Sequence, residues 1–135
     1  MLGNIFKKLK YKGEKYEKLT DADINKLCEA LKDNNTFVGE LNLAKNDLTD
    51  LSGLYLANCM KTFTGWRKLV LKDNKMSSKT GESIGNVLID NPDYVIEELD
   101  FEGIKLEQYG LRRIIVAATH NKNIKKLNLG ILTDF

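Results

Sequence analysis

The chain is poor in the residues that build covalent links and catalytic centres. Its 135 residues include two cysteines, one histidine, one proline and one tryptophan. A disulfide framework in a small secreted domain usually needs four or more cysteines, so Cys28 and Cys59 favour a reducing compartment. We expect them to be small core residues, with a redox or metal role as the alternative. These two cysteines and His120 show no recognisable zinc spacing, and we expect no metal, no cofactor and no catalytic residue.

Long apolar runs are also missing. No stretch approaches the roughly 18 apolar residues of a membrane-spanning helix. Residues 1–8 lack the long apolar region and the small-residue cleavage site of a secretory signal. From these two absences we expect a cytoplasmic protein.

Charge of one sign does not dominate either. Twenty-one basic and 19 acidic residues give a formal net charge of +2, far from the strongly basic composition typical of nucleic-acid binding. We therefore expect no nucleic-acid partner. The densest positive region is the group of lysines between positions 7 and 18. It is interpreted as a solvated surface, with weak peripheral contact to an anionic membrane as the alternative.

What the chain does contain is a repeated leucine pattern. The stretch 38–48 reads V-x-x-L-x-L-x-x-N-x-L, and its first leucine, Leu41, recurs as Leu69, Leu99 and Leu127, spaced 28, 30 and 28 residues apart. The later copies are Trp66-x-x-Leu69-x-Leu71-x-x-Asn74-x-Met76, Ile96-x-x-Leu99-x-Phe101-x-x-Ile104-x-Leu106 and Ile124-x-x-Leu127-x-Leu129-x-x-Leu132. A period shared by four copies indicates a repeat architecture. Val38 and Trp66 stand at the first apolar position of their copies, and we expect both in the core.

The intervals between the copies carry apolar residues at helical spacing, which predicts one amphipathic helix in each interval. Helix starts are marked by Thr20, Thr49 and Ser77, whose side-chain oxygens can accept from the free amides of a first turn. Gly53 recurs 28 residues later as Gly81. We expect these glycines to allow tight packing of helix against strand.

These strand-and-helix units resemble leucine-rich repeats of the ribonuclease-inhibitor-like subclass, which also occur in tropomodulin-type and related intracellular proteins. The resemblance implies an α/β fold, a right-handed solenoid with a concave parallel β-sheet and convex helices. It also implies that Asn46 and Asn74 satisfy backbone groups in the turn after each strand. Ile104 stands at the asparagine position of the third repeat, so the backbone groups of that turn must be satisfied in another way.

The domain boundaries follow from the same pattern. We expect a single domain in which residues 1–36 are a degenerate first repeat acting as an N-terminal cap, and residues 37–135 are leucine-rich repeats with the last one truncated. At the C-terminal edge two interpretations stay open. Either Ile131, Leu132 and Phe135 close the core, or the last strand pairs with another copy or a larger chain.

In such a solenoid the Leu-x-Leu side chains point inward and the residues between them point out from the concave face. These outward residues are the candidate partner-binding site: Glu40, Asn42, Lys68, Val70, Lys72, Glu98, Asp100, Glu102, Lys126 and Asn128. Ala44 and Gly130 also point outward, as do Lys8, Lys10 and Lys12 if the first segment adds a strand.

Strands in register would place Lys68 beside Glu40 and Glu98, Lys72 beside Glu102, and Glu98 beside Lys126. One interpretation is that these pairs merely keep the sheet surface soluble. The other is a banded surface that selects a partner of complementary charge.

The resemblance implies a non-catalytic protein-protein interaction module that binds a protein partner on the concave face. Two alternatives stay open. One is a regulatory subunit or inhibitor that covers an enzyme's active site, for which the concave acidic residues would have to be free of neutralising lysines. The other is a tropomodulin-like cytoskeletal role.

Overall fold

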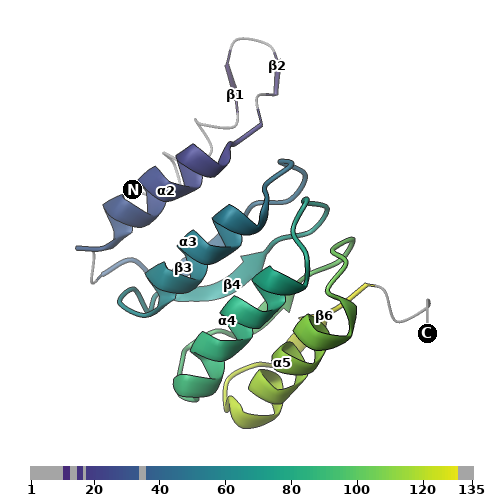
Figure 1. Cartoon of the computed structure of the whole chain (residues 1–135). Helices are drawn as coiled ribbons and strands as arrows, with labels where there is room; N and C mark the ends of the chain where they lie inside the picture. Colours follow the sequence, from purple (N-terminus) through teal and green to yellow (C-terminus); the bar gives the residue numbers. More distant parts are fainter. Residues whose placement is uncertain (1–10, 13–14, 17, 34–35, 131–135) are drawn as a thin grey trace.

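Strands and helices alternate along the chain as the repeat pattern predicts (Figure 1). The computed structural model describes residues 11–12, 15–16, 18–33 and 36–130. Its elements are β1 (Tyr11–Lys12), β2 (Lys15–Tyr16), α2 (Asp21–Leu31), β3 (Gly39–Asn42), α3 (Asp50–Met60), β4 (Trp66–Val70), α4 (Ser78–Asp90), β5 (Glu98–Asp100), α5 (Glu107–His120) and β6 (Lys126–Asn128).

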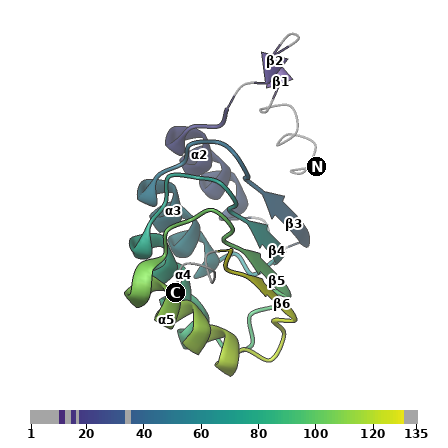
Figure 2. The same cartoon turned by 90° about the vertical axis from the view of Figure 1, so that its right-hand side faces the viewer.

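The four strands β3 to β6 form one parallel sheet in chain order. Their register aligns the leading leucines, with Leu41 beside Leu69, Leu69 beside Leu99, and Leu99 beside Leu127. Helices α2 to α5 lie side by side in a second layer, and Figure 2 shows the strands on one side of the molecule and the helices on the other. This is the expected α/β leucine-rich-repeat solenoid.

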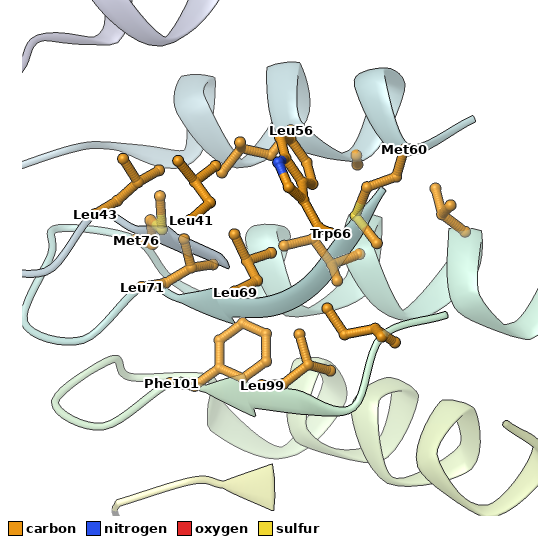
Figure 3. Packing of buried hydrophobic residues seen from close by; sticks show 14 of the residues in the cluster. Leu41, Leu43, Leu56, Met60, Trp66, Leu69, Leu71, Met76, Leu99 and Phe101 are labelled. Carbon is orange, nitrogen blue, oxygen red and sulfur yellow. The ribbon is translucent and has the colours of Figure 1, made fainter. Parts of the chain in front are cut away.

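The hydrophobic core fills the space between the two layers. Leu41, Leu69 and Leu99, with Leu43, Leu71 and Phe101 just after the same strands, point from the sheet toward the helices, where Leu56 and Met60 meet them (Figure 3). Trp66 is 1% exposed, as the repeat pattern predicts.

The core assignment of Val38 is wrong, because this side chain is 52% exposed. The pairing of β3 with β4 shifts between Gly39 and Glu40, so Gly39 rather than Val38 stands beside Trp66. Phe37 packs against the core instead, and its ring stacks on Phe63 with the centroids 6.2 Å apart.

The sequence suggested that Gly53 and Gly81 pack against strands, but they pack against the neighbouring helix. A Cβ atom on Gly53 would overlap Thr80 Oγ1 in α4, and one on Gly81 would lie 3.1 Å from the carbonyl oxygen of Gly110 in α5. A Cβ atom on Gly85 of α4 would lie 2.9 Å from the carbonyl carbon of Arg113 in α5. One on Gly110 of α5 would lie 2.7 Å from the carbonyl oxygen of Ser78 in α4. The absence of a side chain at these two positions lets the backbones of α4 and α5 approach closely.

The first segment departs from the repeat. β1 and β2 form an antiparallel pair of their own, with Tyr11 beside Tyr16 and Lys12 beside Lys15, and they are not part of the parallel sheet. Lys12 is therefore not a member of the concave strands. Lys8 and Lys10 lie outside the described residues, as do Ile131, Leu132 and Phe135.

The side chain of Asn74 joins two consecutive repeats. Its Nδ2 donates to the carbonyl oxygens of Leu43 at 2.8 Å and Leu71 at 2.9 Å. Its Oδ1 accepts from the backbone amides of Asn46 at 3.1 Å and Leu48 at 2.9 Å. One buried amide group thus satisfies backbone atoms of two successive turns, which would otherwise be buried without partners.

Asn46 repeats this arrangement one unit earlier. Its Nδ2 donates to the Leu43 carbonyl at 2.9 Å, and its Oδ1 accepts from the amide of Leu19 at 2.9 Å. Asn46 therefore fastens the segment before α2 to the turn after β3. The predicted asparagine ladder is confirmed for both residues.

A second ladder joins the starts of the helices. The carboxylate of Asp50, the first residue of α3, accepts from the Ser77 amide at 2.8 Å, the Ser77 hydroxyl at 2.6 Å and the Thr80 hydroxyl at 2.7 Å. Asp21 of α2 holds Thr49 in the same way, through its amide at 3.0 Å and its hydroxyl at 2.8 Å. Each carboxylate thus orders the N-cap of the next repeat.

Replacing Asn74 by alanine should lower the free energy of unfolding by about 3 kcal/mol, because buried backbone groups lose their partners. Asn58→Ala is the matched control, since Asn58 is exposed on α3, and it should stay within about 0.5 kcal/mol. Urea unfolding followed by the fluorescence of Trp66, the single and buried tryptophan, measures both. Equal stability of Asn74→Ala and the wild type would contradict the ladder's role.

Asp50→Asn should destabilise the fold by about 2 kcal/mol at neutral pH, because three donors lose a charged acceptor. Burial acts to raise the pKa of Asp50, but the hydrogen bonds from Ser77 and Thr80 outweigh it and the pKa is lowered. A carboxylate whose pKa is lower in the folded state than in the unfolded state stabilises the fold when it is ionised. This stabilisation is fully present above the unfolded-state pKa, about 3.9, and is lost as pH falls through the folded-state pKa.

The difference between wild type and Asp50→Asn should therefore shrink below about pH 4. Urea unfolding at a series of pH values from neutral to acidic tests this. Asp90→Asn, at the exposed last position of α4, is the control and should follow the wild-type pH profile. A difference that stays constant down to the most acidic sample would contradict the explanation.

Candidate functional site: the concave face

The register of the sheet arranges the predicted site residues in rows across the four strands. We call the rows together the concave face. The first row is Glu40, Lys68, Glu98 and Lys126, and the second is Asn42, Val70, Asp100 and Asn128. The third row follows the strand ends and contains Ala44, Lys72, Glu102 and Gly130. The sheet thus brings all ten predicted residues to one side of the molecule.

The first row alternates in charge from strand to strand. Lys68 stands between Glu40 and Glu98 as the sequence predicts, and its Nζ lies 3.1 Å from Glu98 Oε2. The hydrogen bond to Glu98, followed by the charges of Glu98 and Glu40, raises the pKa of Lys68. In the third row Lys72 Nζ lies 3.4 Å from Glu102 Oε2. Two of the three central acidic side chains are therefore held by a lysine of the preceding strand.

The second row is used partly by the fold itself. Asn42 Oδ1 accepts from the Ala44 amide at 3.0 Å, and Asp100 Oδ1 accepts from the Glu102 amide at 2.9 Å. Val70 is only 6% exposed, because it lies on an inner strand among longer side chains of the neighbouring rows. Val70 therefore offers almost no surface to a partner, and the accessible part of the candidate site is narrower than the sequence suggested.

The side of the face where the strands begin is hollowed. A depression of about 460 Å³ lies over the strand starts, lined by Val38, Gly39, Glu40, Arg67, Lys68, Glu97, Glu98, Lys125 and Lys126. A second depression, of about 270 Å³, continues it under Phe37, Val38, Arg67 and Val95. The two share Val38 and Arg67, and we call them together the rim groove.

The rim groove combines apolar surface with charge. Val38 is 52% and Val95 38% exposed, although both are large apolar residues. Lys125 Nζ lies 3.0 Å from Glu97 Oε1, so these two charges are paired. Among the described residues no ion pair forms at the guanidinium of Arg67, the carboxylate of Glu40 or the ammonium of Lys126. These three groups can therefore meet a partner without first breaking an internal ion pair.

Sequence reasoning missed Arg67 and Val95 as site residues and placed Val38 in the core. The repeat template fixes only the inward positions, and all three residues lie within three positions of a strand start. The register shift at Gly39 that exposes Val38 has no counterpart in the leucine pattern.

Other chemistry is sparse in the described part of the chain. Within the described ranges no three histidine, cysteine, aspartate or glutamate side chains gather closely enough to hold a metal ion. His120 is exposed at the end of α5, where its Nδ1 lies 2.9 Å from the carbonyl oxygen of Val116. Of the helices described, none is long and apolar enough to cross a bilayer.

Comparisons with known proteins agree with this architecture. The chain is 28% identical over 112 residues to "NACHT, LRR and PYD domains-containing protein 3" of Mus musculus and 28% identical over 111 residues to the same protein of Rattus norvegicus. These matches cover 83% and 82% of this chain but only 11% of each relative. The chain thus spans about a tenth of the length of the curated relatives it matches. No family model matches the chain.

Among solved structures the fold is similar to "Leiomodin-1 Actin-Binding Site 2 (ABS2)", with a TM-score of 0.68 and 19% sequence identity over 82% of this chain and 63% of that one. The fold is therefore a leucine-rich-repeat solenoid. With the sequence similarity and the repeat period of about 28 residues, the chain is a leucine-rich-repeat protein of the ribonuclease-inhibitor-like type.

Proposed function

We propose that this chain is a non-catalytic protein-protein interaction module that binds a protein partner on the concave face, with the rim groove as its anchoring point. The observation that carries the proposal is the rim groove itself. Exposed valines there lie beside an arginine that has no internal ion pair among the described residues. Arginine is enriched among the residues that dominate interface energies, and the exposed valines beside it give a partner apolar surface to bury.

The size and charge of the face fit this role. A standard interface covers about 800 Å² on each partner, which is about a tenth of the 7951 Å² surface of the described chain. The alternating charges of the first row favour a partner with the opposite alternation, because like charges placed opposite each other penalise wrong partners. Glu40 and Lys126, at the two ends of that row, are free to define the register.

A tropomodulin-like cytoskeletal role is the specialised version that one observation favours. The solved structure of similar fold is named as an actin-binding site of leiomodin-1. Actin is therefore the first protein to test as a partner. We also propose that residues 1–36 act as the N-terminal cap, supported by the packing of α2 on α3 and the bond from Leu19 to Asn46.

The inhibitor alternative is less well supported. It needs an acidic concave surface free to meet a basic partner. Glu98, Glu102 and Glu97 each lie within 3.4 Å of a lysine ammonium group. The acidic residues at the centre of the face are thus largely neutralised within the sheet.

Titration of the fluorescently labelled chain of residues 1–135 with purified actin tests the cytoskeletal version. Arg67→Glu and Lys126→Glu should each weaken binding about tenfold or more, which corresponds to roughly 1.4 kcal/mol. Arg112→Glu, an exposed position on α5 in the helix layer, makes the same charge change away from the concave face. It should change the dissociation constant less than about twofold.

If the chain does not bind actin, the cytoskeletal version is wrong. A second measurement then tests the general proposal. In that measurement, proteins cross-linked to the wild-type chain in its native cell extract are quantified against the same three variants. A partner that is lost with Arg67→Glu and Lys126→Glu but kept with Arg112→Glu is expected. If the partners are equally retained by all variants, the concave face is not the binding site.

A further inference from the structure

Two cysteines from successive helices meet in the helix layer. Cys28 lies on α2 and Cys59 on α3, both near the C-terminal ends of their helices, and both are free thiols. Cys59 Sγ lies 4.0 Å from the carbonyl oxygen of Cys28, although the residues are 31 positions apart. Both residues also line the same surface depression.

We propose that Cys28 and Cys59 are a redox modification site, at which a peroxide converts the neighbouring thiols into a reversible disulfide that joins α2 to α3. The inference does not depend on what the concave face binds, because the pair lies in the helix layer. Among the described residues no third ligand gathers with the two thiols, so the site is built for sulfur-sulfur chemistry rather than for a closed metal centre.

The pair is reachable by a small oxidant. A surface depression of about 280 Å³ is lined by both cysteines together with Asn25, Lys32, Tyr55 and Asn58. Cys28 is half-buried and Cys59 is 6% exposed. A molecule the size of hydrogen peroxide can therefore approach the sulfur atoms from this depression.

Either thiol can react first. Cys28 is the more exposed of the two, and Cys59 lines the same depression. Because the thiolate is the nucleophile, the cysteine that ionises attacks the peroxide and the other acts as the resolving thiol.

The chemistry balances with one peroxide molecule. One of the two thiolates attacks one peroxide oxygen, the O–O bond breaks, and sulfenic acid forms at that cysteine while the hydroxide that leaves takes up the thiol proton as water. The sulfur of the second cysteine then attacks the oxidised sulfur, the S–O bond breaks, and the proton of the second thiol leaves with the oxygen as water. Two thiols are oxidised to a disulfide, and one peroxide is reduced to two waters.

The product has a structural consequence. A bond between residues 31 positions apart closes a loop that contains the turn after α2 and the whole of β3. It restricts the unfolded chain, and the oxidised form should melt about 5 °C or more above the reduced form. Reduction would release α2 from this covalent tie and return the chain to the state described here.

The test uses the reduced full-length chain and hydrogen peroxide, followed by denaturing alkylation and intact mass measurement. We expect the mass of the main product to fall by about 2 Da with neither cysteine alkylated, and dithiothreitol to restore two alkylation sites. Peptide mapping should show Cys28 linked to Cys59 in a monomer. The same treatment of the chain unfolded in urea should form the intramolecular disulfide at least about tenfold more slowly, because the fold no longer holds the thiols together.

Two single variants test the need for both thiols. Cys28→Ser and Cys59→Ser should each accumulate sulfenic acid at the remaining cysteine, trapped with dimedone, and neither should form an intramolecular disulfide. The wild-type measurement does not depend on either variant folding. The proposal is overturned if both wild-type thiols stay alkylatable at a peroxide dose that oxidises free dithiothreitol, if the product is an intermolecular dimer, or if oxidation is as fast in urea.

Discussion

The amide side chain of Asn74 is the interaction on which the rest of the molecule depends. It binds the carbonyl oxygens of two successive turns with its nitrogen and two amides of the earlier turn with its oxygen. Buried backbone groups need partners, and the side chain of Asn74 supplies them for these two turns. By linking equivalent turns, Asn74 fixes β3 and β4 in register, and Asn46 extends the link back to Leu19.

The register of the strands determines which side chains stand beside each other on the surface of the sheet. Because the leading leucines align, the residue before each of them aligns as well, and the first row alternates as glutamate, lysine, glutamate and lysine. At the helix starts Asp21 and Asp50 hold the next N-cap in place. Each repeat is thus tied to its neighbour at the turn and at the helix start, and the concave charges are displayed on a rigid support.

The sequence predicted the structural features that occur at the same position of successive repeats. Leu41, Trp66 and Asn74 obey the template, and the contact of Lys68 with Glu98 follows once the strands are in register. Val38 was misplaced because the shift at Gly39 breaks the alignment locally. Phe37, two residues before Gly39, stacks on Phe63, a contact that the pattern of apolar and polar residues does not record.

The rim groove and the thiol pair escaped prediction for two further reasons. Arg67 and Val95 occupy positions that the template leaves variable, so their exposure and proximity are known only from the folded sheet. Cys28 and Cys59 are separated by 31 residues rather than by the repeat period. Contacts between neighbouring helices can join residues that are offset by a few positions from the repeat spacing. The hydrogen bond from Ser52 to Asp21, which also joins residues 31 positions apart, is an example.

The third repeat shows how the fold compensates when the ladder stops. The residue before the ladder position has a left-handed backbone in the three repeats where the structure describes it, with φ of 62° at Lys45, 55° at Asp73 and 77° at Gly103. That conformation costs an ordinary residue roughly 1–2 kcal/mol, and in the first two turns the bonds of Asn46 and Asn74 offset this cost. Ile104 has no amide to offer and is fully buried. A glycine precedes it, for which the left-handed turn carries little strain, so the substitution at the ladder position and the glycine beside it belong together.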